Sequence, residues 1–144
     1  GTNPAVPLLR HVKKWAETAT SDDGSLMINN ELFRERIART AIINQVGQLL
    51  TLRAAWIAAT GGMPGVEGSM AKIYASEEYQ KVVSWFQQMA GAEGLLGFGA
   101  DGAAASGWID YDARHAPVTT IYGGTSEINR NNVAERHLGL PRNR

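Results

Sequence analysis

The sequence has no cysteine among its 144 residues. Disulfide bonds, thiolate metal sites and cysteine nucleophiles are therefore excluded, and cysteine usage leaves the redox compartment open. Histidine is scarce as well: His11, His115 and His137 lie far apart and form no His-x-x-x-His or Glu-x-x-His pair. Because metal ligands recur at short, regular spacings, we predict no metal site.

An excess of charge of either sign is also missing. The chain has 14 basic and 14 acidic side chains, a formal net charge of zero. A nucleic-acid or anionic-membrane partner would require a basic surface, so we expect neither.

Long apolar runs are lacking. The charge-free stretch 54–66 contains Gly, Thr and Pro, and no segment is long and apolar enough for a bilayer. The first residues show no basic-then-apolar signal pattern. We therefore expect a soluble, cytoplasmic protein without a membrane span.

Apolar periodicity predicts helices throughout the chain. Residues 6–19 form the first, with Val6, Leu9, Val12 and Trp15 at a spacing of three. The second is long: it is capped by Asn30, runs to about Thr60 and ends at Gly61-Gly62. Its apolar residues are expected to form one face: Phe33, Ile37, Ala41, Ile42, Val46, Leu49, Leu50 and Ile57.

A third helix is predicted from about Val66 to Gly91 and a shorter one from Ser126 to about His137. Between them, residues 92–117 are rich in glycine and show no clear structure, so we expect a long loop there, often a functional feature. Within it, Asp110 and Asp112 could form an acid–base pair on one side of an extended segment, but we expect solvated loop carboxylates. These elements predict an all-α fold, an antiparallel four-helix bundle, in a single domain over 1–144.

The most informative stretch precedes the last helix. It reads Tyr122-Gly123-Gly124-Thr125-Ser126-Glu127-Ile128. Two glycines permit a tight turn and close approach of a ligand, Thr125 or Ser126 suits a helix N-cap, and Glu127 suits the positive helix end. A capped turn without any ligand explains these residues equally well. Glu127 competes for the free N–H groups, which argues against a phosphate site.

This stretch, followed by Ala134-Glu135-Arg136-His137-Leu138-Gly139-Leu140-Pro141-Arg142, resembles the C-terminal end of acyl-CoA dehydrogenases. The resemblance covers essentially the whole chain but only the C-terminal helical domain of a roughly three-domain subunit. It therefore implies a fragment of a larger subunit, inactive alone. The complete subunit is expected to use FAD to introduce a 2,3 double bond into an acyl-CoA thioester. Electron-transfer flavoprotein and other dehydrogenase subunits, in homo- or hetero-oligomers, are the partners the family implies.

The resemblance also implies cofactor contacts. Gln88, Gly91 and Gly94 match the family segment that touches the FAD of a neighbouring subunit, although Ala92 and Leu95 depart from it. Without the resemblance, Gly91 and Gly94 need only end the third helix. Tyr122 belongs to the motif, and Gly124 and Thr125 match contacts to the adenosine end of FAD. Glu127 stands where the family often has Gln, and no arginine in 16–24 matches the family's FAD-binding arginine.

This sequence departs most from the family pattern at the position of the catalytic base. Many family members have a glutamate at the position of Gly123, and glycine cannot accept a proton. Glu127 is expected to cap its helix rather than replace that base. Two alternatives stay open: the base lies upstream of Gly1, or this chain is the non-catalytic half of a heteromeric enzyme. The alternative function from another class is a helical domain that has no redox role and serves only in oligomerisation. Because its helices would lack partners from other domains, we expect the isolated chain to self-associate.

Overall fold

The computed structural model describes residues 5–63 and 65–142. These residues contain five α-helices: α1 (Ala5–Ala16), α2 (Glu31–Ala59), α3 (Glu67–Ala90), α4 (Trp108–Thr119) and α5 (Ser126–Arg136). Three short 3₁₀ helices accompany them: η1 (Met27–Asn29), η2 (Gly91–Leu95) and η3 (Ala104–Gly107). Their only β-pairing is one isolated bridge between Thr20 and Leu26. The all-α prediction is confirmed.

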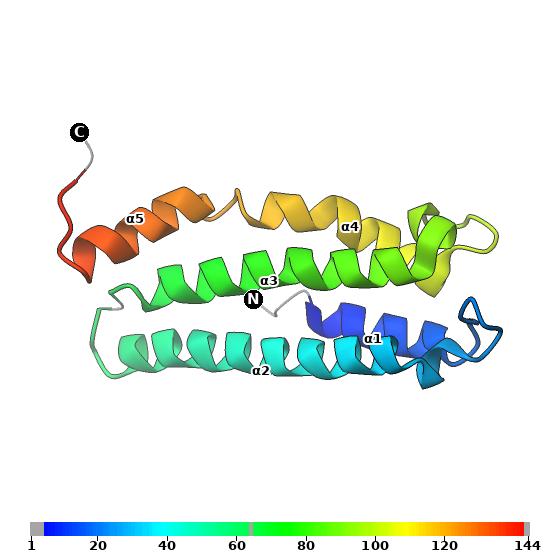
Figure 1. Cartoon of the computed structure of the whole chain (residues 1–144). Helices are drawn as coiled ribbons and strands as arrows, with labels where there is room; N and C mark the ends of the chain where they lie inside the picture. The colour runs from blue at the N-terminus through cyan, green and yellow to red at the C-terminus, as the bar shows by residue number, and fades with distance from the viewer. Residues whose placement is uncertain (1–4, 64, 143–144) are drawn as a thin grey trace.

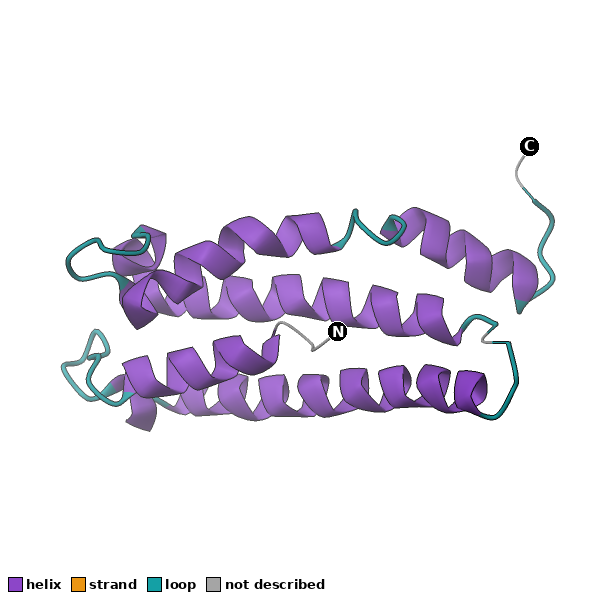
Figure 2. Ribbon diagram, turned by 180° about the vertical axis from the view of Figure 1, so that it is seen from behind, coloured by secondary structure: helices purple, strands orange, loops and turns teal. Residues whose placement is uncertain are grey.

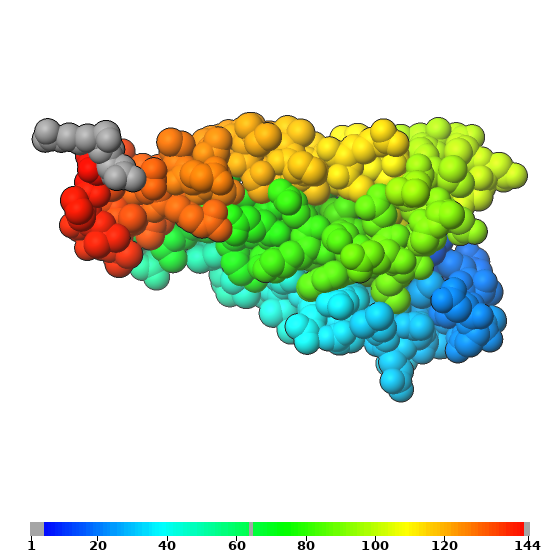
Figure 3. All heavy atoms as spheres, turned by 45° about the horizontal axis from the view of Figure 1, so that its top comes forward, coloured from blue at the N-terminus to red at the C-terminus, as the bar shows by residue number. Residues whose placement is uncertain are grey.

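The helices lie roughly parallel to one long axis (Figure 1). α3 runs through the middle, α1 and α2 lie on one side of it, and α4 and α5 follow one another on the other side (Figure 2). In the space-filling view, α4 and α5 form one continuous ridge along the molecule (Figure 3). The architecture is thus an antiparallel four-helix bundle whose last member is divided into two helices by the turn at 120–125.

Local signals explain where the long helices begin and end. The Asn30 side-chain oxygen accepts a hydrogen bond from the Phe33 N–H at 3.0 Å and caps α2, as predicted. Gly61, with φ of +80°, follows Thr60, and the Gly62 N–H bonds back to the Ile57 carbonyl at 2.9 Å. α3 ends at Gly91, where φ is +58°.

The prediction of a structureless loop over 92–117 is wrong, because α4 fills its second half. The inward side of α4 is formed by Ile109, Asp112, Ala116 and Thr119, which are all buried. Two of these four residues are polar, so the apolar period that marks a helix is masked in the sequence. Asp110 and Asp112 are likewise not solvated loop carboxylates, since both are buried on α4.

The predicted core faces need correction too. On α1 the buried residues are Ala5, Leu8, Val12 and Ala16, whereas Val6 is half exposed. Phe33, Thr40, Ile43 and Gly47 are the buried residues of α2. Ile42 and Leu49, which we placed on the same face, point to solvent. The long helix is therefore apolar on two sides, and only one of them packs on the core.

A buried hydrogen bond joins the central helix to α4. The Tyr79 hydroxyl on α3 donates to the Asp112 carboxylate, and both side chains are buried. Burial raises the pKa of the Asp112 carboxyl, against the opposing effect of the Tyr79 hydrogen bond and of nearby His115. Burial and, to a smaller extent, the hydrogen bond to Asp112 raise the pKa of the Tyr79 hydroxyl. The pair fixes the register of α4 on α3.

Gly107, at the start of α4, is a position that only glycine can occupy. Its φ is +92°, and a Cβ there would lie 2.5 Å from the Phe98 nitrogen. The chain at 97–98 therefore rests directly on the first turn of α4.

None of the helices in the described ranges combines the length and apolar character that crossing a membrane requires.

We expect Gly107→Ala to destabilise the chain by at least about 2 kcal/mol, because it combines a strained backbone with a clash against main-chain atoms. Gly68→Ala is the matched control: Gly68 lies in α3, and a Cβ there meets nothing within 4 Å. That change is expected to stabilise the chain by roughly 0.5–1 kcal/mol. Urea unfolding of both variants measures the two effects, and equal stabilities would refute the tight contact.

The pKa of Asp112 also predicts a pH dependence. A carboxyl whose pKa is raised by folding contributes stability below its ordinary value of 3.8, and this contribution is lost as pH rises through the folded pKa. Asp112→Asn removes the charge, so the variant should gain stability relative to wild type between pH 4 and pH 7. Chemical unfolding across this range tests the sign, and a constant difference would show that Asp112 is not perturbed.

Candidate functional site

The turn between α4 and α5 is the centre of the candidate site. Gly123 and Gly124 both have positive φ, +69° and +87°. The Thr125 side-chain oxygen accepts a hydrogen bond from the Ile128 N–H at 3.3 Å, so Thr125 is the N-cap of α5. Gly123 is exposed, and a Cβ at that position would meet nothing within 4 Å. The turn thus presents bare backbone at the positive end of a helix dipole.

A residue that the sequence analysis missed holds this turn in place. Asn129 is buried, and its side-chain nitrogen donates to the carbonyls of Gly124 at 2.9 Å and Thr125 at 3.0 Å. A Cβ on Gly124 would lie 3.1 Å from that nitrogen. An asparagine four residues after a predicted N-cap is the signal that could have indicated this role.

Tyr122 is tied to α4 rather than to α5. Its ring lies nearly parallel to that of His115, 6.3 Å between centroids, and His115 in turn stacks on Tyr111. About half of the Tyr122 side chain is exposed. The aromatic residue of the motif is therefore positioned beside the turn with a face open to solvent.

Glu127 lies at the exposed start of α5. A hydrogen bond from its own backbone N–H and, to a smaller extent, one from the Thr125 hydroxyl lower the pKa of the Glu127 carboxyl. A carboxylate that is solvated and stabilised in its charged form is a weak base. The geometry therefore favours a capping role for Glu127, as the sequence analysis expected.

The central helix supplies a polar wall beside the turn. A hollow of about 520 Å³ is lined by Glu77, Gln80 and Lys81 of α3 together with Thr120, Ile121, Thr125, Ser126, Glu127 and Arg130. Arg130 bonds Glu77 at 2.6 Å, and the Gln80 side chain donates to the Thr120 hydroxyl at 3.4 Å. The three α3 residues of this wall were not predicted from the sequence, although Gln80 and Lys81 follow Glu77 by three and four residues and so share one helix face with it.

Two buried polar atoms in the described residues have no hydrogen-bond partner, the Lys72 ammonium nitrogen and the Ser126 hydroxyl. Burial lowers the pKa of Lys72, while Glu127 and Glu77 nearby oppose that shift. Ser126 is the first residue of α5. Polar atoms without partners near a helix start are compatible with a polar ligand there.

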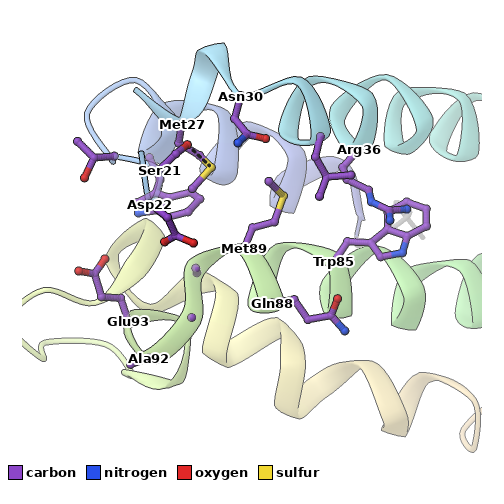
Figure 4. Close-up of a pocket in the computed structure, with 15 residues that line it drawn as sticks. Ser21, Asp22, Met27, Asn30, Arg36, Trp85, Gln88, Met89, Ala92 and Glu93 are labelled. Atoms are coloured by element: carbon purple, nitrogen blue, oxygen red, sulfur yellow. Dashed lines mark hydrogen bonds between the residues drawn. The ribbon is translucent and has the colours of Figure 1, made fainter. Parts of the chain in front are cut away.

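The second group of predicted residues lies at the other end of α3. Gln88 and Gly91 line a hollow of about 680 Å³ between the end of α3, the start of α2 and the loop at 20–22 (Figure 4). Arg36 lies over the Trp85 ring at 4.3 Å in its wall. Gln88 is exposed and donates to the Ser84 hydroxyl at 3.3 Å.

Gly94 differs from the other members of its group. It is buried, and a Cβ there would come within 2.9 Å of the Ala90 Cβ. Its small size lets η2 fold back against the end of α3.

The two groups of candidate residues are not brought together. Gln80 contacts the turn at Thr120, and Gly91 follows eleven residues later on α3, about 16 Å along the helix. The two groups therefore line two separate hollows. In the described ranges, no three His, Asp or Glu residues are grouped so that they could hold a metal ion.

Comparisons with known proteins agree with this architecture. The family model described as "Acyl-CoA dehydrogenase, C-terminal domain" matches residues 5–138. Acyl-CoA dehydrogenase FadE26 of Mycobacterium tuberculosis is 25% identical over 142 residues, which cover 96% of this chain and 36% of that protein.

Solved structures give the same result. A chain of the ChsE4-ChsE5 complex from Mycobacterium tuberculosis superposes with a TM-score of 0.84 at 26% identity, covering 97% of this chain and 36% of that one. A chain of the Tcur3481-Tcur3483 steroid ACAD superposes with a TM-score of 0.82 at 27% identity, covering 96% of this chain and 35% of that one. The chain spans about a third of the length of these relatives. With the helix order, the 120–125 turn and the family match in agreement, this chain belongs to the acyl-CoA dehydrogenase C-terminal domain family.

Proposed function

We propose that this chain is the C-terminal domain of an FAD-dependent acyl-CoA dehydrogenase, whose complete subunit oxidises an acyl-CoA thioester. The observation that carries the proposal is the turn at 122–127, where two glycines with positive φ lead into a capped helix within a domain of this family. The chain alone is expected to be inactive, because it spans only about a third of the length of its relatives and its turn holds no carboxylate suited to remove the α-proton.

The residues present fit FAD in part. Bare backbone at Gly123 and Gly124, the start of α5 and the unpartnered Ser126 hydroxyl suit a polar portion of the cofactor. The negative charge of the Glu127 carboxylate argues against a phosphate group at the same position, because the two would repel each other. Gln88 and Gly91, exposed at the far end of α3, are proposed to contact the FAD of a neighbouring subunit. Gly94 is proposed to support them from beneath.

When bound, FAD would supply the redox chemistry by accepting a hydride from the β-carbon of the thioester. The residues of this chain would hold and orient the cofactor. Tyr122 offers an aromatic face beside the turn, and Asn129 keeps the turn in one conformation. No carboxylate of this turn is suited to remove the α-proton, because position 123 is glycine and Glu127 is solvated with a lowered pKa.

A second candidate function is the non-catalytic half of a heteromeric dehydrogenase. The missing carboxylate at Gly123 favours it, and so does the likeness to a chain of the ChsE4-ChsE5 complex. Because another similar structure is described as a steroid ACAD, a thioester attached to a steroid is the substrate class to test first.

The two candidate functions differ in which part of the enzyme supplies the catalytic base. In the complete subunit, changing a candidate glutamate upstream of Gly1 to Gln is expected to reduce α-proton exchange at least ~10²-fold while FAD stays bound. Glu127→Gln should change the exchange rate only slightly, since losing a charge at a helix start costs about 0.3–1 kcal/mol. Deuterium exchange into the thioester measures both.

An inactive Glu127→Gln variant beside an active upstream variant would make Glu127 the base and overturn this assignment. If both variants exchange normally, the base comes from a partner subunit, and this chain is the non-catalytic half.

The role of Asn129 can be tested separately. In the complete subunit, Asn129→Ala removes two hydrogen bonds to the turn, so we expect about tenfold weaker FAD binding, or ~1.4 kcal/mol. Asn131→Ala is the control, because Asn131 is exposed on the same helix. Flavin fluorescence titration gives both affinities. Equal affinities for the two variants would show that the turn does not contact FAD.

A further inference from the structure

A row of aromatic side chains runs along the outer side of α4 and ends at the turn of the candidate site. It begins at Trp108 and continues through Tyr111 and His115 to Tyr122, and we term these four residues the aromatic row. Tyr111 and Tyr122 are 46% and 53% exposed, whereas Trp108 and His115 are half-buried. Positions 108, 111 and 115 share one helix face because they are three and four residues apart. The row is thus a continuous aromatic surface that adjoins the motif turn.

Three rings of the row lie in nearly parallel planes. The planes of Tyr111 and His115 differ by 24° and those of His115 and Tyr122 by 26°, with centroids 6.0 and 6.3 Å apart. Rings in direct face contact would have closer centroids, so these three are displaced from one another. Displaced parallel rings keep part of each face open. They therefore form a strip of ring faces rather than a closed stack.

The row is held in place from beneath and at its far end. The Tyr79 ring of α3 meets His115 at a steep angle, 6.2 Å between centroids, and the Tyr79 hydroxyl is itself bound to buried Asp112. His11 of α1 stacks on Trp108 at 4.3 Å. Rings that are fixed before a ligand arrives lose little conformational freedom when it binds. This arrangement favours a binding surface that is already formed.

The segment before α4 has a strained backbone that brings a further ring to the row. Ala105 and Ser106 have φ of +49° and +56°, values that cost free energy in residues other than glycine. The tight contact of Gly107 with the Phe98 main chain then brings the Phe98 ring edge-on to Trp108, 5.0 Å between centroids. The Phe98 side chain is 56% exposed. It therefore adds a side wall to the strip.

The middle of the row carries little net charge. Arg114, the cation beside Tyr111 and His115 on α4, is bound by the Asp110 carboxylate at 2.9 Å. An apolar ligand lying on these rings would therefore not bury an unpaired guanidinium. Several ring faces follow one another, so the ligand that suits them is flat, uncharged and longer than a single ring.

We propose that the aromatic row binds a flat fused-ring system in the acyl group of the thioester, with the ring system lying over Tyr111 and His115. This inference rests on the proposed function and deepens it by naming residues that select the acyl group. Tyr122 joins the row to the turn, so a thioester that reacts beside the turn has its rings further along α4. A fused-ring system contacts several open ring faces at once, whereas a straight acyl chain has no flat face. The row thus favours ring-bearing thioesters over straight-chain ones.

Substitution of Tyr111 in the complete protein tests this assignment. Tyr111→Leu keeps an apolar side chain but removes the flat face, so we expect about tenfold weaker binding of a steroid-bearing 2,3-enoyl-CoA. Binding of straight-chain 2-octenoyl-CoA should change by less than about twofold, since it makes no face contact. Tyr111→Phe is the matched control: it keeps the ring, and its affinity for both thioesters should equal that of the wild type. Calorimetric titration with these reaction products measures affinity without turnover.

A second substitution in the row, His115→Leu, should cause the same selective loss. Helical content and bound FAD, measured for each variant, should be unchanged because Tyr111 is exposed and His115 half-buried.

An equal loss of affinity for both thioesters in Tyr111→Leu would indicate a merely structural role and overturn the assignment. Unchanged affinity for the steroid-bearing thioester would overturn it as well. In both cases the proposed function stands, because the wild-type protein still binds an acyl-CoA thioester. A complete wild-type protein that binds neither thioester would refute the proposed function together with this inference.

Discussion

All the other α-helices of the described chain pack against α3, and this constraint determines where each candidate residue lies. The buried hydrogen bond from Tyr79 to Asp112 fixes α4 on it, and the half-exposed ion pair between Glu77 and Arg130 links α5 to it. The turn at 120–125 is held between these two attachments. Its position is therefore set by tertiary contacts of the helices on either side, and Asn129 refines its conformation locally.

The same central helix keeps the two candidate regions apart. The turn lies beside the middle of α3, whereas Gln88 and Gly91 lie at its end. Under the proposed function, each of the two hollows would form part of a different cofactor position, completed by other parts of an assembly. The exposed apolar side of α2, with Ile42, Leu49, Leu52 and Trp56, is a third surface, separate from both hollows. The fold thus acts as a scaffold that presents three distinct surfaces around one packed helix.

Long elements with strong local signals were predictable from the sequence. Asn30 and Gly61 mark both ends of α2, and the Thr125 cap marks the start of α5. α4 was missed because Asp112 and Thr119 occupy its buried face, and only the Tyr79 contact on a distant helix makes Asp112 acceptable there. The single apolar face assigned to α2 was wrong for a different reason: it combined Phe33, on the core side, with Ile42 and Leu49, which lie on the exposed side. Periodicity shows which residues share a side of a helix, but not whether that side meets the core or another chain.

The candidate residues divide in the same way. The turn residues could be named from a local motif, and Asn129 follows them on the same helix, whereas Gln80 and Lys72 of α3 lie beside the turn only because of tertiary packing. The central claim is that this domain supplies parts of a flavin site and encloses none alone. Calorimetric titration of the 144-residue chain with FAD tests it most directly. The account predicts no measurable binding by the chain and stoichiometric binding by the complete protein. Micromolar binding of FAD by this chain alone would contradict it.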